Sequence, residues 1–258
     1  MERPACADIS GGLERTAVSF INEVDAEHLP YFEYTTANVP GPGSDEQSFN
    51  EVFASCNCQP ACSPQCPCVL RSNRARLAAA IECSSLCSCG PDCSNRDVQH
   101  GVRCRLQVFK TQGKGFAVRT MEPILRGSYV CSYAGEVISL EVARQRVSKL
   151  ARSEPNYVMV LRENGAATLV LDPRRVGGVG RFLNHSCEPN LAITPVRTEC
   201  VVADLAFFAK RDIREGEELT YDYSGGCHSS SQRSSIKCAC GSKRCLGWLP
   251  MDKLVLGI

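Results

Sequence analysis

Cysteine is the residue type with the clearest chemistry in this sequence, because the chain has 18 cysteines among 258 residues. Nine follow the spacing C-x-C-x3-C-x3-C-x-C and then C-x3-C-x-C-x3-C; they are Cys56, Cys58, Cys62, Cys66, Cys68, Cys83, Cys87, Cys89 and Cys93. Three tetrahedral zinc ions need twelve ligand positions, which nine thiolates supply when six bind one ion and three bridge two. Disulfides, or separate four-cysteine sites, would leave one thiol over. The pattern therefore predicts a structural cluster of three zinc ions.

This cluster would have a net charge of minus three, so nearby arginines are expected to neutralise part of it, and the candidates are Arg71, Arg74 and Arg76. A second group, in CACGSKRC, supplies only three ligands: Cys238, Cys240 and Cys245. A fourth ligand must come from elsewhere, and Cys187 and Cys227 are the candidates. The other cysteines are expected to be small apolar or incidental residues; they are Cys6, Cys104, Cys131, Cys200 and Cys227.

Overall composition is that of an ordinary globular chain. Lys and Arg number 29 against 28 Asp and Glu, a formal charge of +1, which argues against a surface devoted to nucleic acid or anionic membrane. The first residues, MERPACADISGG, lack the apolar core of a signal peptide, and no run approaches the roughly 18 apolar residues that would span a bilayer. We therefore expect an intracellular, soluble protein with no membrane partner, in which clustered cysteines bind metal.

Short β-branched runs separated by turn residues begin near Cys104 and predict a mainly β domain. A helix is expected at 140–151, capped by Ser139, and a hairpin turn at Asn164-Gly165. The segment between Cys68 and Cys83 is expected to be a loop or short helix. The predicted organisation is an extended N-terminal arm (1–53), a cysteine-rich module (54–103), the β domain (104–224), a Ser/Gly linker (225–233) and a second cysteine module (234–250).

Four motifs in this order, the nine-cysteine group, YAGE, RFLNHSCEPN and GEELTYDYS, are followed by C-x-C-x4-C. From Cys56 to Pro250 the sequence resembles the SET-domain protein-lysine methyltransferases with pre-SET and post-SET modules. FEYTTANVPGPG, QVFKT and YAGEVISLEVARQR resemble the subgroup fused to a mariner transposase. The resemblance implies the SET (β-clip) fold of small curled sheets, with a pseudoknot in which RFLNHS threads past ELTYDY. A three-zinc pre-SET module would precede this fold and a one-zinc post-SET module would follow it.

The resemblance also implies S-adenosylmethionine as the methyl donor. The matching cofactor positions are Lys114, Gly115, Phe116, Tyr157, Arg181, Phe182, Asn184 and His185. The sequence departs from the family at two positions, since Phe116 replaces the usual Trp and Gly178 a frequent Asn. The catalytic positions are Tyr223, Tyr133 and Tyr221. Cys187 is implied as the fourth ligand of the second zinc site, which would hold Leu246 and Trp248 against the substrate channel.

The implied function is methylation of a lysine in the histone H3 tail in the nucleus, on chromosomes, with the H3 tail or nucleosome as partner. Lysine 36 is favoured over lysine 9 because of the transposase-fused subgroup. Tyr221, in place of Phe, favours mono- and dimethyl products. A non-histone substrate is an alternative. Another is a catalytically silent zinc module that binds chromatin or DNA weakly through RSNRAR (71–76) and Arg174-Arg175, which leaves Tyr133, Tyr223 and NHSC unexplained.

Overall fold

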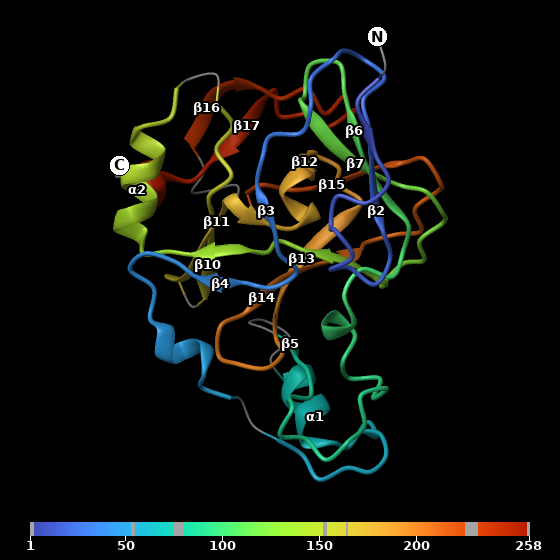
Figure 1. Ribbon diagram of the computed structural model, residues 1–258. Coiled ribbons are helices and arrows are strands. Elements are labelled where there is room, and N and C mark those ends of the chain that lie inside the picture. Colours follow the sequence, from blue (N-terminus) through green and yellow to red (C-terminus); the bar gives the residue numbers. More distant parts are fainter. Residues whose placement is uncertain are drawn as a thin grey trace.

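The structure is a computed structural model that describes residues 3–52, 55–74, 80–151, 154–163, 165–224 and 232–256 (Figure 1). Within these residues strands dominate, as predicted, and form four sheets. The first contains, in order, β1 (Ala5–Cys6), β2 (Val18–Ile21), β6 (Leu106–Lys110), β7 (Phe116–Thr120), β15 (Glu218–Tyr221) and β12 (Asn184–His185). The second contains β10 (Met159–Glu163), β11 (Ala166–Gly177), β9 (Gly135–Val137) and β4 (Val39–Pro40), with β3 (Glu33–Tyr34) also pairing with β11.

The two smaller sheets and the helices complete the described fold. The third sheet contains β5 (Ala80–Ile81), β13 (Leu191–Arg197), β14 (Asp204–Ala209) and β8 (Tyr129–Ser132); the fourth contains β16 (Gln232–Lys237) and β17 (Trp248–Met251). The helices are η1 (Glu46–Phe49), α1 (Pro67–Arg74), η2 (Val98–His100), α2 (Leu140–Ser148), η3 (Val179–Phe182) and α3 (Lys253–Leu256). Among the described residues, no helix has the length and apolar character needed to cross a bilayer.

Alternation of buried and partly exposed residues explains the central strands. In β2, Val18 and Phe20 face the core, and in β6 so do Leu106 and Val108, because successive side chains of a strand point to opposite faces. The parallel pairing of β2 with β6 aligns Phe20 with Val108. These side chains join the main core, which extends under β8 and β15.

Two local predictions are confirmed with small differences. Ser139 caps α2 by accepting a hydrogen bond from the Val142 amide at 3.2 Å, but the helix ends at Ser148 rather than at Ala151. Strands β10 and β11 form the expected antiparallel hairpin, with Glu163 paired with Ala166. Gly165 has a φ of 83°, which suits a tight turn, whereas Asn164 lies outside the described residues.

The segment expected as an extended arm supplies four short strands, β1 to β4, to two of the sheets. The cysteine-rich segment, with α1, lies below most of the sheets in Figure 1, and its strand β5 pairs with β13 of the third sheet. The parallel pairing of β12 with β15 places Asn184 opposite Thr220 and His185 opposite Tyr221. RFLNHS and ELTYDY are therefore neighbours, as expected of the pseudoknot.

Candidate functional site

Three tyrosines converge at the end of β15. The ring centroids of Tyr221 and Tyr223 are 4.8 Å apart, and those of Tyr133 and Tyr221 are 6.4 Å apart. The Tyr133 hydroxyl donates a hydrogen bond to the main-chain carbonyl of Tyr157 at 2.5 Å, and the Tyr223 hydroxyl donates one to the carbonyl of Leu183 at 2.9 Å. Because each of these protons is held by a carbonyl, the lone pairs of both phenol oxygens are left for a third group.

The environment keeps these phenols protonated. Burial raises the pKa of Tyr133 and of Tyr221 well above the ordinary value, and neighbouring ionisable groups add to the effect. The pKa of Tyr223 is also raised, first because the surrounding protein displaces water and then because Tyr157 is near. None of the three is therefore suited to act as a phenolate base near neutral pH. Their oxygens can orient a bound amine.

Asn184 and His185 tie β12 to its surroundings. The Asn184 amide nitrogen donates to the carbonyl of Phe116 and to the Glu218 carboxylate, each at 3.2 Å. His185 is 5% exposed, and its Nδ1 accepts a hydrogen bond from the Tyr223 backbone amide at 3.2 Å. These contacts fix β12 relative to the start of β7, to the start of β15 and to Tyr223, which follows β15.

A glycine-rich turn joins β6 to β7. Gly113 and Gly115 have φ angles of 97° and 73°, and the Thr111 hydroxyl closes the turn by donating to the Gly115 carbonyl at 2.8 Å. L-residues with side chains rarely adopt these angles, so the sequence needs glycine here. The Lys114 ammonium lies 2.5 Å from Glu218. Glu218, which the sequence analysis did not single out, therefore connects this turn with Asn184.

Arg181 is the most unusual side chain of the region. It is 5% exposed, and its guanidinium carbon lies 4.8 Å from the Tyr157 ring centroid, 5.2 Å from that of Phe182 and 4.4 Å from that of Phe32. Within the described part of the chain, neither Nε nor Nη1 has a hydrogen-bond partner. Burial lowers the pKa of this arginine. Buried, unpaired donors of this kind are available to a polar ligand.

The residues that the resemblance assigns to the cofactor are thus gathered from four segments. The turn at 111–115, the residue Tyr157, helix η3 and strand β12 all reach the same region of the fold. The unpaired nitrogens of Arg181, the aromatic rings around it and the open backbone at Gly115 fit a ligand that has both a carboxylate and a planar base, as S-adenosylmethionine does.

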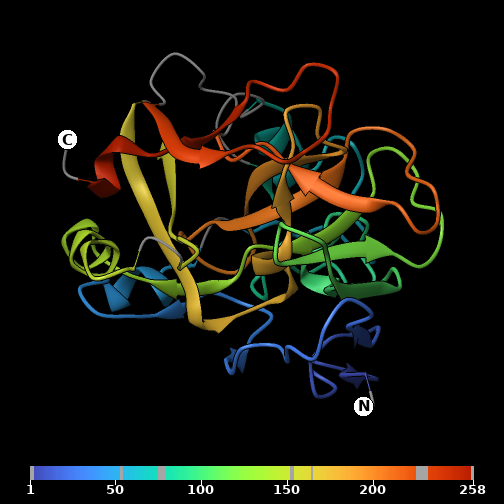
Figure 2. The same ribbon diagram turned by 90° about the horizontal axis from the view of Figure 1, so that it is seen from above.

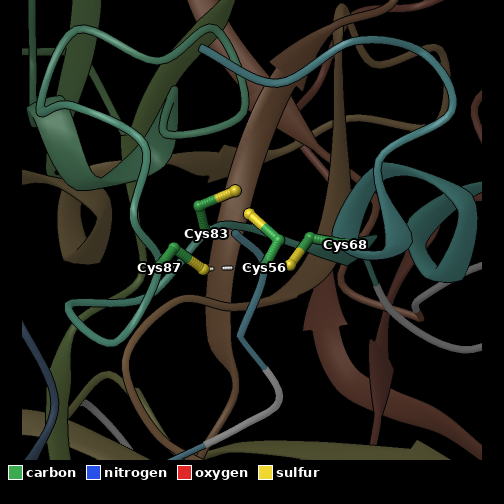
Figure 3. Close-up of side chains that lie close together, drawn as sticks. All are labelled: Cys56, Cys68, Cys83 and Cys87. Carbon is green, nitrogen blue, oxygen red and sulfur yellow. Dashed lines mark hydrogen bonds between the residues drawn. The ribbon is translucent and has the colours of Figure 1, made fainter. Parts of the chain in front are cut away.

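The first cysteine group forms three overlapping quartets in which all sulfurs lie within 4.8 Å of one another. They are Cys56, Cys68, Cys83 and Cys87; Cys56, Cys62, Cys66 and Cys83; and Cys62, Cys83, Cys89 and Cys93. The first quartet is drawn in Figure 3, where the four sulfurs converge. Cys56, Cys62 and Cys83 each belong to more than one quartet, which is where bridging thiolates would lie. Cys58 belongs to none of the three.

A cation that was not predicted lies against this group. Arg96, 8% exposed, donates to the Ser84 carbonyl at 2.7 Å and to the Cys89 sulfur at 3.7 Å. The side chains of Arg71 and Arg74, and all of Arg76, lie outside the described residues. Arg96 was missed because nothing in its local sequence marks it, although it follows the last cysteine of the group by only three residues.

The second cysteine group closes around Cys187. The sulfurs of Cys187, Cys238, Cys240 and Cys245 lie within 4.8 Å of one another. Of the two candidates for the fourth ligand, Cys187 completes the quartet, and Cys227 lies outside the described residues. The Leu246 backbone amide also points to the Cys187 sulfur, at 3.4 Å. The C-terminal segment with β16 and β17 thus crosses the same side of the molecule as the end of β12 (Figure 2).

Comparison with known proteins gives the family. Residues 115–224 match the SET domain and residues 10–96 match the Pre-SET motif. Histone-lysine N-methyltransferase SETMAR of Rattus norvegicus is 39% identical over 97% of this chain and 89% of the rat protein. The chain belongs to the SET-domain histone-lysine N-methyltransferases. Probable histone-lysine N-methyltransferase set-23 of Caenorhabditis elegans is also 39% identical, over 86% of this chain and 97% of the worm protein.

Solved structures agree with this membership. The methyltransferase domain of human SETMAR superposes with a TM-score of 0.84 at 35% identity, covering 96% of this chain and 98% of that one. KRYPTONITE, solved with DNA, an H3(1-15) peptide and SAH, has a TM-score of 0.76 at 29% identity, covering 95% of this chain and 53% of that one. This SET-domain chain is therefore an S-adenosylmethionine-dependent methyltransferase, and its two cysteine groups correspond to the zinc-binding pre-SET and post-SET modules.

Proposed function

We propose that this methyltransferase modifies a lysine of the histone H3 tail, with lysine 36 preferred over lysine 9, and that it forms mainly mono- and dimethyl-lysine. The observation that carries this proposal is the convergence of Tyr133, Tyr221 and Tyr223, two of them with hydroxyl protons held by main-chain carbonyls. The preference for lysine 36 rests on resemblance to the transposase-fused subgroup. The H3(1-15) peptide bound by KRYPTONITE, which includes lysine 9, is the reason to test both positions.

We assign cofactor binding to the eight predicted residues, Lys114, Gly115, Phe116, Tyr157, Arg181, Phe182, Asn184 and His185. When bound, S-adenosylmethionine supplies the methyl group from its positively charged sulfonium. The free donors of Arg181 suit an anionic or oxygen-bearing part of the ligand, and the Gly115 backbone permits close approach. Asn184 and Glu218 hold the walls of the site in register.

The tyrosines act on the lysine amine. An unperturbed lysine has a pKa near 10.4, so its deprotonation near pH 7 costs about 4 kcal/mol. A narrow, poorly hydrated channel next to a positive sulfonium reduces this cost, because both disfavour the ammonium form. Tyr223 and Tyr133 then accept hydrogen bonds from the neutral amine and align it for in-line transfer. The protonated phenols are consistent with this orienting role.

We assign to Tyr221 the control of how many methyl groups are added to the lysine. This residue is 6% exposed and packs against Phe207, with ring centroids 4.8 Å apart. Among the described residues, no hydrogen bond to its hydroxyl is found. A water held by this hydroxyl would fill space that a methylated amine needs in order to turn for another transfer.

Both cysteine modules are assigned structural zinc, with three ions bound by Cys56, Cys58, Cys62, Cys66, Cys68, Cys83, Cys87, Cys89 and Cys93, and one ion bound by Cys187, Cys238, Cys240 and Cys245. The count of three ions is supported by the three sulfur quartets, which are linked by Cys83 in all three and by Cys56 and Cys62 in two each. The second site would hold Leu246 and Trp248 near Cys187, at the end of the pseudoknot strand β12.

We place the protein in the nucleus, on chromosomes, with the H3 tail or the nucleosome as partner. A DNA contact through the basic segments is a weaker part of the proposal. Arg174, one of the residues expected to contribute, donates instead to Glu154 at 3.2 Å and to the Pro155 carbonyl at 2.7 Å. Any DNA contact would therefore depend on the 71–76 segment and on Arg175, which is exposed.

The test is methyl transfer from radiolabelled S-adenosylmethionine to two H3 peptides, one centred on lysine 9 and one on lysine 36, followed by mass spectrometry. We expect incorporation mainly at lysine 36 and its loss in Tyr223→Phe. Incorporation mainly at lysine 9 would contradict the preference for lysine 36 and leave the histone assignment intact. No incorporation into either peptide or into core histones would contradict the histone assignment, and a panel of non-histone peptides would then identify the substrate.

A further inference from the structure

The N-terminal segment of residues 20–35, here called the strap, lies against the residues assigned to the cofactor. Phe32 contacts two of them at once. Its ring centroid is 4.4 Å from the guanidinium carbon of Arg181, and 5.6 Å from the Phe182 ring centroid in an edge-to-face arrangement. A cation over a ring face and an edge-to-face ring pair are both attractive, and more so away from water. Phe32 and Tyr157 thus both lie against this guanidinium.

The strap also reaches the aromatic residue of the glycine-rich turn. Phe20 packs edge-to-face on Phe116 with centroids 5.8 Å apart. The Lys110 ammonium lies 4.6 Å from the centroid of the same ring and forms ion pairs with Asp25 and Glu27 of the strap. Three of the eight cofactor positions, Phe116, Arg181 and Phe182, are therefore in contact with the strap or with a residue that it holds.

The backbone fixes the strap next to η3, which carries Arg181 and Phe182. Strand β3 pairs in parallel with the end of β11, and the Thr35 amide donates to the Gly177 carbonyl at 3.1 Å. A Cβ atom at Gly178 would lie 2.9 Å from the Thr35 carbonyl oxygen, so this approach requires a residue without a side chain. The Tyr34 hydroxyl anchors the same stretch by donating to Glu14 at 3.0 Å.

We propose that Phe32 is a positioning residue for the cofactor site: it holds the Arg181 guanidinium, whose Nε and Nη1 have no protein partner among the described residues, in the orientation that the ligand requires. A buried guanidinium with two unpaired donors has no hydrogen bonds to fix those nitrogens, so the flanking rings fix its plane. Without the Phe32 ring, water would reach Arg181 and the side chain would gain other rotamers. The proposal rests on the cofactor assignment above.

The experiment compares Phe32→Ala with two matched variants, using calorimetric titration of S-adenosylhomocysteine and steady-state methylation of the preferred H3 peptide. Phe32→Tyr keeps the ring. Tyr31→Ala removes the adjacent aromatic residue, which is 96% exposed. We expect Phe32→Ala to raise the Kd for S-adenosylhomocysteine and the KM for S-adenosylmethionine by about tenfold, the scale of losing one desolvated cation–ring contact. The peptide KM should change by less than about twofold in all variants, as should the cofactor Kd in the two controls.

A double-mutant cycle gives the readout that a purely structural role would not change. If Phe32 acts through Arg181, then Arg181→Lys should weaken binding by itself, and adding Phe32→Ala to it should cost much less than tenfold more. An unchanged Kd in Phe32→Ala overturns the proposal. So does a double variant whose loss of affinity equals the product of the losses in Phe32→Ala and Arg181→Lys. A reduced binding stoichiometry at an unchanged Kd would show partial unfolding and also overturns it. Wild-type protein that binds no S-adenosylhomocysteine would instead overturn the cofactor assignment itself.

Discussion

The rings of Tyr221 and Tyr223 lie 4.8 Å apart and are tilted by 43°, with only Asp222 between them in the sequence. The first is 6% exposed and the second 40% exposed. Of these two tyrosines, only Tyr223 donates its hydroxyl proton to a main-chain carbonyl within the described residues. Two tyrosines that are two residues apart thus have different surroundings, and the proposed division between orienting the amine and limiting the number of methyl groups rests on this difference.

Replacement of Tyr221 by Phe is expected to increase trimethylation. The change removes one oxygen and almost no apolar contact, so the melting temperature should stay within about 2 °C while the space beside the amine grows. Mass spectrometry of the preferred peptide at successive times checks this. Phe207→Leu, which changes the packing behind the same ring, is the control. Wild-type protein that trimethylates its peptide to completion would show that Tyr221 does not limit the product.

Removal of Cys83 is expected to be more damaging than removal of Cys58. Cys83 belongs to all three sulfur quartets and also accepts a hydrogen bond from the Asn95 side chain at 3.3 Å, whereas Cys58 belongs to none. Structural zinc contributes directly to folding, so Cys83→Ser should be recovered largely as insoluble protein. Cys58→Ser should stay partly soluble, and Cys6→Ser, at an exposed cysteine, should match the wild type.

Elemental analysis measures the metal content of the same proteins. The wild type should contain about four zinc ions per chain, three in the first module and one in the second. Two or fewer would be incompatible with the bridged cluster.

Replacement of Cys245 by Ser should remove one zinc ion and most of the activity while the β domain stays folded. Cys245 is exposed, and its quartet joins the C-terminal segment to Cys187 rather than supporting the main core. Without the ion, Leu246 and Trp248 would no longer be held beside β12. Circular dichroism and the methylation assay separate folding from activity, with Cys200→Ser as control. Activity equal to that of the wild type would rule out this role of the second site.

Replacement of Asn184 by Ala should weaken binding of S-adenosylhomocysteine by about tenfold or more. The variant loses hydrogen bonds to the Phe116 carbonyl and to Glu218, each worth about 1 kcal/mol, and with them the register between β7 and β12. His185→Lys should weaken binding of S-adenosylmethionine more than that of S-adenosylhomocysteine, because it adds a cation at a buried position and only the methyl donor carries the positive sulfonium. Calorimetric titration measures both, and Asn50→Ala, at an exposed position, is the control. Unchanged affinity in both variants would refute the cofactor assignment of β12.

Asp204 should make stability depend on pH. Burial raises the pKa of this carboxyl from 3.8 to about 6, although the Thr198 hydroxyl donates to it at 2.9 Å. The folded protein therefore retains this proton at pH values where the unfolded chain has lost it. The contribution of Asp204 to the free energy of unfolding should fall as the pH rises from about 4 to 6, by on the order of 3 kcal/mol.

In Asp204→Asn this decrease should be absent. Urea unfolding of both proteins at pH 4.5 and pH 7 measures the difference, and other titrating groups cancel in the comparison. The same pH dependence in both proteins would show that Asp204 does not titrate in this range.

The sequence by itself determined the features that depend on local spacing and composition. Nine cysteines at ligand spacing predicted the clustered sulfurs because thiolate number and zinc geometry impose a ligand count that few arrangements satisfy. Ser139 predicted the start of α2 because a cap acts within four residues, and short β-branched runs between turn residues predicted β6 and β7. The resemblance of whole motifs then predicted that Tyr133, Tyr221 and Tyr223 belong to one site.

Only the tertiary structure decided which distant groups meet. Arg96 lies against the described sulfurs, Glu218 links Lys114 to Asn184, and Phe32 covers Arg181. None of these pairs has a characteristic spacing. The path of the chain brings them together, through the pairing of β3 with β11 and of β12 with β15, and the energy of each contact depends on the burial created by that packing. Periodicity reports which face of an element is buried, but it does not report which element covers that face.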